Sequence, residues 1–123
     1  MATILLVDDD EDVRYALAKV LRRGGHVVDV AEDGRQALAR LAVGGVNLVI
    51  SDIIMPEFDG IELLRQVNAR FPELPVIAIS GGGRIGKAEY LTLATCLGAR
   101  RTLQKPIEPD ELLREVGAVV GAG

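Results

Sequence analysis

The regular alternation of two hydrophobic patterns constrains the fold of this 123-residue chain more than any other feature. Short apolar runs alternate with stretches in which apolar residues recur at helical spacing. The apolar runs cover residues 3–7, 26–30, 47–51, 76–80 and 102–104, and the helical stretches cover residues 11–23, 34–43, 60–70, 87–97 and 109–120. This order predicts five consecutive strand–helix units.

The composition of the runs indicates how the strands are arranged. Residues 47–51 and 76–80 are almost entirely apolar and do not alternate with polar residues. Such strands are typical of a parallel sheet whose two faces are both covered by helices. We therefore predict an α/β fold with a doubly wound five-stranded parallel sheet and helices on both faces.

The bulk composition excludes several classes of protein. Hydrophobic residues make up 49% and charged residues 26% of the chain, as in a globular protein. The net charge of −4 argues against direct nucleic-acid binding, which requires a basic surface. No apolar run is long enough to cross a membrane, and the single cysteine cannot form an intramolecular disulfide. We expect a cytoplasmic protein with no membrane partner.

Polar side chains follow the predicted strands where each strand ends. Asp8 and Asp9 follow the first apolar run, Asp52 follows the third, Ser80 closes the fourth, and Lys105 follows the fifth. Because the carboxyl ends of parallel strands meet at one edge of a sheet, we expect these groups to share one pocket. The acids of residues 10–12 fit the first turn of a helix instead.

The chemistry of this set indicates a phosphoryl-accepting site. Crowded carboxylates ionise together only at a cost, unless a cation lies among them. An all-oxygen site of this charge suits Mg²⁺. The Lys105 ammonium can pair with a phosphoryl oxygen, and the Ser80 hydroxyl can donate a hydrogen bond to another.

The whole chain, residues 1–123, resembles a response-regulator receiver domain of two-component signalling. The motifs that carry the resemblance are residues 4–10, 52–56 with 59–60, Ser80, and 98–99 leading to 105–106. The resemblance implies a flavodoxin-like sheet of strand order 2-1-3-4-5. It also implies one receiver domain with no effector domain.

The resemblance assigns a role to each pocket residue. It implies that Asp52 is the phosphoacceptor, that Ser80 and Lys105 contact the phosphoryl group, and that Mg²⁺ is the cofactor. The metal ligands that it implies are Asp8, Asp9, Asp52 and the backbone carbonyl of Ile54. The bond between Lys105 and Pro106 is often cis in the family.

The implied function is a phosphorylation-activated switch rather than a turnover enzyme, because the domain catalyses only its own phosphorylation and dephosphorylation. Its phosphoryl donor would be a sensor histidine kinase or a histidine phosphotransfer protein, and its output would be altered binding to a downstream protein. Thr102 departs from the pattern, since receivers commonly carry tyrosine or phenylalanine three residues before the lysine.

Two other functions remain open at this point. Asp8-Asp9-Asp10 also fits the aspartate-x-aspartate motif of a haloacid-dehalogenase-like phosphatase with Asp8 as nucleophile. Asp12 departs from that motif, which calls for threonine or valine there. The third possibility is an interaction module that works without phosphate.

Overall fold

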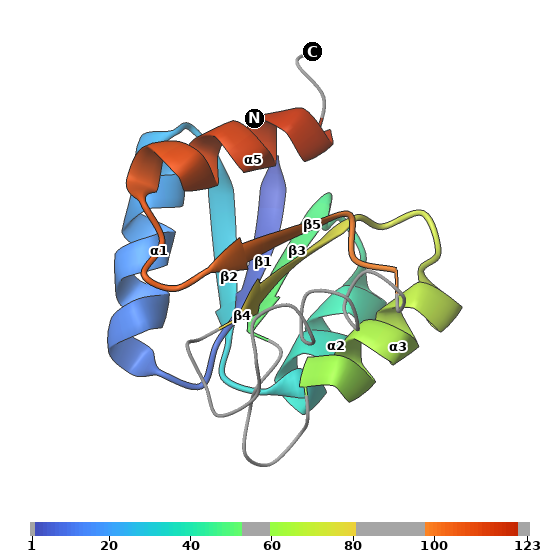
Figure 1. The fold of residues 1–123 in the computed structure, drawn as a ribbon. Coiled ribbons are helices and arrows are strands. Elements are labelled where there is room, and N and C mark those ends of the chain that lie inside the picture. The colour runs from blue at the N-terminus through green and yellow to red at the C-terminus, as the bar shows by residue number, and fades with distance from the viewer. Residues whose placement is uncertain (1, 53–59, 81–97, 121–123) are drawn as a thin grey trace.

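The protein folds around a sheet of five parallel strands in the order β2-β1-β3-β4-β5 (Figure 1), which confirms the predicted topology. The computed structural model describes residues 2–52, 60–80 and 98–120. The strands are β1 (Thr3–Val7), β2 (Val27–Ala31), β3 (Leu48–Asp52), β4 (Val76–Ser80) and β5 (Arg101–Gln104). Within the described ranges, no helix combines the length and the apolar composition that a membrane crossing requires.

The described helices begin and end where the sequence pattern predicts. They are α1 (Glu11–Arg23), α2 (Gly34–Val43), α3 (Gly60–Arg70) and α5 (Pro109–Val120). The carboxylate of Asp10 accepts hydrogen bonds from the backbone N–H groups of Asp12 and Val13, which makes Asp10 the N-cap of α1. The helix predicted at residues 87–97 lies outside the described residues.

Three strands were predicted with bounds that differ by one residue from those of the structure. β2 and β3 start and end one residue later than predicted, and β5 starts one residue earlier. His26 belongs to the turn after α1, because its N–H donates to the Leu21 carbonyl and its ring Nδ1 accepts from the Ala2 N–H. Asp52 belongs to β3 because it pairs in register with Ile79 of β4.

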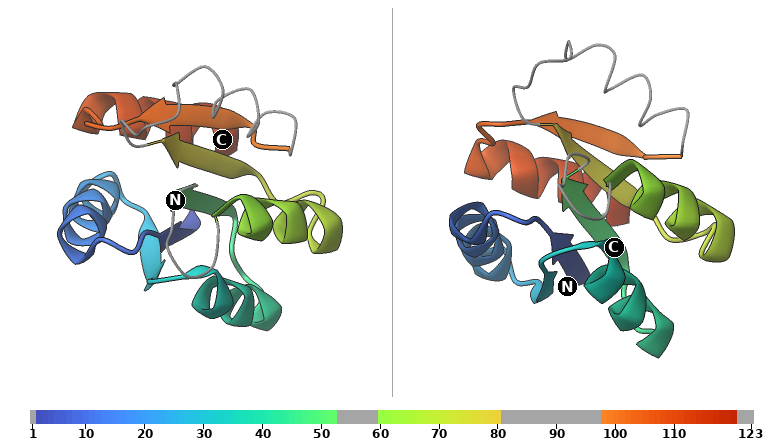
Figure 2. Two further views of the ribbon diagram at one scale, coloured as in Figure 1. Left: turned by 60° about the horizontal axis from the view of Figure 1, so that its bottom comes forward. Right: turned by 90° about the horizontal axis from the view of Figure 1, so that it is seen from below.

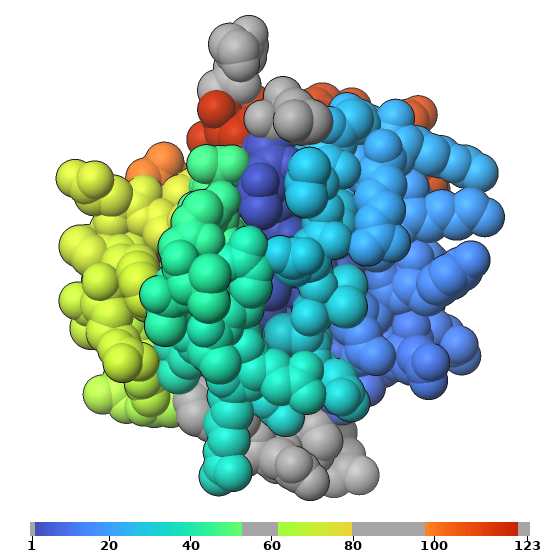
Figure 3. Space-filling view, turned by 180° about the vertical axis from the view of Figure 1, so that it is seen from behind, coloured from blue at the N-terminus to red at the C-terminus, as the bar shows by residue number. Residues whose placement is uncertain are grey.

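Among the described helices, α1 and α5 cover one face of the sheet, and α2 and α3 cover the other (Figure 2). One core lies under α1 and α5 and includes the fully buried Leu6 and Leu112. The other lies under α2 and α3 and includes the fully buried Leu63. Figure 3 shows the molecule from behind, where the side chains of α2 lie between those of α3 and those of α1. Both cores cover the same apolar strands, so the ends of the strands are where polar groups can gather.

Candidate functional site

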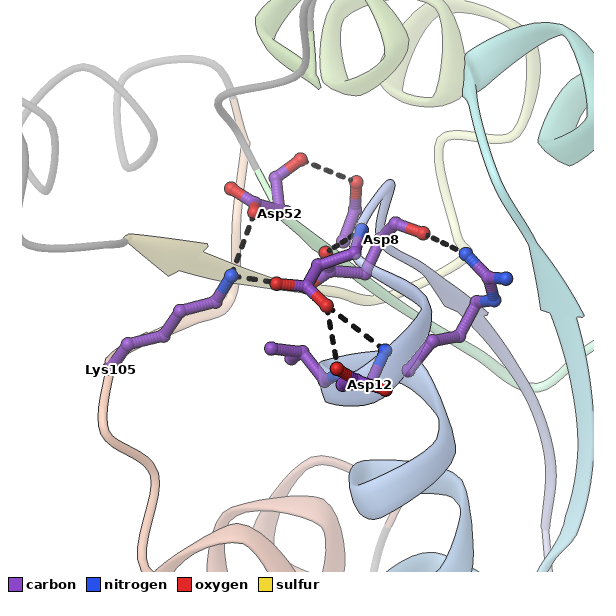
Figure 4. Close-up of polar contacts among 8 residues, drawn as sticks. Asp8, Asp12, Asp52 and Lys105 are labelled. Atoms are coloured by element: carbon purple, nitrogen blue, oxygen red, sulfur yellow. Dashed lines mark hydrogen bonds and ion pairs between the residues drawn. The ribbon is translucent and has the colours of Figure 1, made fainter.

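A buried cluster of opposite charges lies at the carboxyl edge of the sheet. The Lys105 ammonium donates a hydrogen bond to Oδ2 of Asp52 at 3.0 Å, and its nitrogen lies 3.2 Å from Oδ2 of Asp8. Figure 4 shows Lys105 reaching from the segment after β5 toward Asp52 and Asp8. Asp8 is 0% exposed and Asp52 is 4% exposed. One cation therefore bridges two carboxylates that burial shields from water.

The two oxygens of the Asp8 carboxylate have different surroundings. Oδ1 accepts a hydrogen bond from the backbone N–H of Asp10 at 2.9 Å. Oδ2 forms an ion pair with Lys105 at 3.2 Å, and within the described ranges it accepts no hydrogen bond that meets full geometric criteria. Burial raises the pKa of Asp8, despite the opposing effects of the Asp10 N–H and of Lys105. The pocket thus contains a buried oxygen with an unused acceptor position.

The Lys105 ammonium is held in its charged form by the two carboxylates. Burial by itself would lower its pKa. The hydrogen bond to Asp52 and the attraction of Asp52 and Asp8 outweigh burial, so the pKa of Lys105 is raised. The side chain remains 25% exposed, which leaves the ammonium reachable from solvent.

Asp9 completes a group of three carboxylates that suits a hard cation. One oxygen each from Asp8, Asp9 and Asp52 can be chosen so that all three lie within 4.8 Å of one another. Asp9 is exposed, whereas the other two are buried, so the group opens to solvent on one side. Oxygen ligands and a net negative charge are the features that suit Mg²⁺, and Oδ2 of Asp8 keeps an acceptor position for it.

The structure brings together four of the site residues predicted from sequence and places part of a fifth. These four are Asp8, Asp9, Asp52 and Lys105. The backbone of Ser80 ends β4 in register with Gln104, but its side chain is not among the described ones. Ile54 lies outside the described residues. The peptide bond between Lys105 and Pro106 is cis.

Two contacts at the pocket were missed by sequence reasoning. Nη1 of Arg14 donates a hydrogen bond to the backbone carbonyl of Asp8 at 2.7 Å. The Ser51 hydroxyl donates to the backbone carbonyl of Asp52 at 2.9 Å. Neither residue belongs to a spacing pattern that points to a site, because an arginine on a helix or a serine in a strand is common.

A second concave region lies away from the charged cluster, at the opposite edge of the sheet. It is a groove of about 600 Å³ between the segment that precedes β3 and the segment that precedes β4. Leu41, Val46, Phe71 and Leu74 supply much of its apolar lining. Its lining does not include the charged groups described above.

Comparison with known proteins relates the chain to bacterial signalling proteins. A family model described as the response regulator receiver domain matches residues 4–117. The response regulator MprA of Mycolicibacterium vanbaalenii is 33% identical over 117 residues, which are 95% of this chain and 49% of that protein. The response regulator FleR of Pseudomonas aeruginosa is 39% identical over 112 residues, which are 91% of this chain and 23% of that protein. The chain thus spans about half or a quarter of the length of these relatives.

Solved structures give the same relationship. The receiver domain of NtrX from Brucella abortus is 34% identical, with a TM-score of 0.88 over 95% of this chain and 97% of that one. A CheY-like receiver domain protein from Methanospirillum hungatei is 27% identical, with a TM-score of 0.89 over 98% of this chain and 94% of that one. The chain therefore belongs to the response regulator receiver domains, the phosphorylation-activated switches of two-component signalling.

Proposed function

We propose that Asp52 is the residue through which this receiver domain is switched. Its carboxylate attacks the phosphorus of a phosphohistidine, the P–N bond breaks, and the imidazole leaves with the electron pair. The donor would be a sensor histidine kinase or a histidine phosphotransfer protein. The observation that carries the proposal is the position of Asp52 at the end of β3, bound to Lys105 at 3.0 Å and clustered with Asp8 and Asp9.

Lys105 has two tasks in this proposal. Before transfer, its ammonium offsets the repulsion between Asp8 and Asp52, which it contacts at 3.2 and 3.0 Å. After transfer, Asp52 carries a phosphoryl group with additional negative charge, and the partly exposed ammonium is placed to pair with one of its oxygens. Ser80 ends the neighbouring strand β4 and is proposed to donate a hydrogen bond to another phosphoryl oxygen.

Asp8, Asp9 and Asp52 are the residues that would hold Mg²⁺, together with the backbone carbonyl of Ile54. When bound, the ion neutralises charge that develops on the phosphoryl oxygens during transfer. Asp8 supports this assignment because its buried Oδ2 has an acceptor position that no described group fills. Asp9 supports it because it is exposed at the rim, where an ion would enter.

The proposed output is a change in binding to a downstream protein, without turnover of a separate substrate. We place the domain in the cytoplasm, where kinases of this class present their phosphohistidine, and propose no direct contact with nucleic acid. The family match favours this function over the haloacid-dehalogenase-like phosphatase, in which Asp8 would be the nucleophile.

Phosphorylation by acetyl phosphate tests the assignment of Asp52. Intact-mass spectrometry at neutral pH should detect one phosphoryl group when Mg²⁺ is present and none when the metal is chelated. Asp52→Asn should abolish the modification. Asp10→Asn is the matched control, because it removes an exposed carboxylate beside the pocket and should leave the modification intact. A phosphoryl group mapped to Ser80 or His26, or retained by Asp52→Asn, would refute the assignment.

A further inference from the structure

We propose that Arg14 is a positioning residue for the metal ligands of the pocket. Its guanidinium holds the peptide bond between Asp8 and Asp9 in the orientation that brings their carboxylates close to Asp52. This inference rests on the proposed function in one respect, that the pocket takes Mg²⁺.

The backbone carbonyl of Asp8 lies just beyond the last pair of the β1 ladder. β1 ends at Val7, and the N–H of Asp8 makes one more bond, to the Ala31 carbonyl at 3.2 Å. Asp8 is completely buried, so its carbonyl requires a donor from the protein. The half-buried guanidinium of Arg14 supplies it at 2.7 Å, a short distance that is typical of charge-assisted hydrogen bonds.

That carbonyl controls more than Asp8 itself. The peptide unit is planar, so fixing the Asp8 oxygen also fixes the direction in which the chain enters Asp9. Three hydrogen bonds hold this turn: the Asp8 N–H to Ala31, the Asp10 N–H to Oδ1 of Asp8, and Arg14 to the Asp8 carbonyl. Among these three, only the last has a side-chain donor. Substitution of Arg14 can therefore loosen the turn while every carboxylate of the pocket remains present.

The same helix provides a matched control. Arg22 lies two turns further along α1, and its Nη2 donates to the backbone carbonyl of Val28 in β2 at 3.0 Å. Both arginines thus tie α1 to a strand or strand end through one guanidinium–carbonyl bond. Arg14→Met and Arg22→Met remove the same charge and the same kind of bond, but only the first acts at the pocket.

Titration calorimetry with Mg²⁺ alone compares the wild type with both variants. We expect Arg14→Met to bind Mg²⁺ about tenfold more weakly, at the lower end of the loss caused by removing outer-shell partners of metal ligands. Arg22→Met should keep the wild-type affinity, even if urea unfolding shows that both variants lose similar stability. Equal Mg²⁺ affinity of Arg14→Met and the wild type would overturn the inference.

Arg14→Lys separates position from charge. It keeps the positive charge but replaces a planar fork with a flexible point charge. We expect its Mg²⁺ affinity to stay below that of the wild type. A Mg²⁺ affinity of Arg14→Lys equal to that of the wild type would show that the positive charge alone carries the effect, and it would overturn the positioning role.

Failure of this inference can be told apart from failure of the proposed function. If the wild type takes a phosphoryl group on Asp52 while Arg14→Met binds Mg²⁺ normally, only the role of Arg14 is refuted. If Arg14→Met loses Mg²⁺ affinity but acetyl phosphate does not modify even the wild type, the positioning role stands and the phosphoryl-transfer proposal is refuted.

Discussion

At the scale of single residues, the pocket is assembled against a cost in free energy. A buried carboxylate loses its hydration, and Asp8 recovers only part of it through the Asp10 N–H and the ion pair with Lys105. Lys105 stays charged because it contacts two carboxylates. Replacing buried charged groups by neutral ones often stabilises a fold. A protein that keeps such charges therefore commonly uses them for function.

Asp8→Asn should therefore stabilise the metal-free protein at neutral pH. Burial raises the pKa of Asp8 above its usual 3.8, so the folded state favours the protonated carboxyl. Its contribution to stability is fully present below pH 3.8 and is lost as the pH rises through the raised pKa. We expect a gain on the order of 1 kcal/mol in urea unfolding at pH 7, comparable to the cost of one unsatisfied buried polar atom.

The control for this experiment is Asp10→Asn, because asparagine caps a helix about as well as aspartate. It should change stability little, and Mg²⁺ should stabilise it as much as it stabilises the wild type. If Asp8→Asn is less stable than the wild type without metal, the argument that the burial of Asp8 is only partly compensated is wrong.

His26 should make stability depend on pH in the opposite direction. Burial lowers its pKa below 6.5, and its ring Nδ1 accepts a hydrogen bond from the Ala2 N–H, which requires an unprotonated Nδ1. Its contribution is fully present above pH 6.5 and is lost as the pH falls through the lowered pKa. The stability difference between the wild type and His26→Gln should shrink between pH 8 and pH 5 in urea unfolding. A constant difference across that range would contradict this prediction.

At the scale of elements, local signals define the helices, and one glycine sets the backbone conformation of the segment that leads into β5. α1 begins at a side-chain cap, and α2 begins at Asp33, whose carboxylate accepts from the Gln36 N–H. Gly98 has a φ of +104°, and a Cβ there would lie 2.7 Å from Oδ1 of Asn68 on α3. That segment leads into β5 and then to Lys105, so its geometry affects where the ammonium lies.

Two glycine-to-alanine substitutions should have opposite effects. Gly98→Ala should destabilise the protein by about 1–2 kcal/mol, because its backbone conformation disfavours any side chain. Gly117→Ala should stabilise it by roughly 0.5–1 kcal/mol, since Gly117 lies inside α5 with open space around its Cα. Chemical denaturation of the two variants under one condition measures both effects. Equal signs would contradict the prediction.

At the scale of the whole molecule, the sheet separates two cores that share its strands. Ile4 faces the core under α1 and α5, whereas Leu63 belongs to the core under α2 and α3, and both are fully buried. Hydrogen bonds join neighbouring strands within the sheet, but side chains on opposite faces of the sheet do not touch. The two cores should therefore contribute independently to one cooperative transition.

Substitutions in the two cores should be additive. Ile4→Val should cost about 0.5–1.5 kcal/mol and Leu63→Ala about 2–5 kcal/mol. The double variant should match their sum within about 0.5 kcal/mol, because the sites share no side-chain partner. Urea unfolding monitored by circular dichroism, together with hydrogen exchange, measures the free energy of unfolding of each single variant and of the double variant. A larger deviation would indicate that the sheet couples the faces.

The helix positions followed from the sequence because they depend on neighbours along the chain, and the membership of the pocket followed from the rule that parallel strands end at one edge. The caps, glycine stops and helical spacing of α1, α2 and α3 are local, and their bounds were predicted correctly. Asp8, Asp9, Asp52 and Lys105 were assigned to one edge because they stand at the ends of parallel strands. The roles assigned to these residues, to Ser80 and to Ile54 remain predictions.

Strand register and the contacts within the pocket were decided by the tertiary structure. Asp52 became part of β3 because Ile79 of another strand lies beside it, and no local signal reports a partner so far along the chain. The bridge from Lys105 to Asp52 joins residues 53 positions apart. The contact of Arg14 with Asp8 depends on how α1 packs against the sheet. Composition and spacing determine which groups reach one edge, but only packing sets the distances between them, and those distances govern their charges.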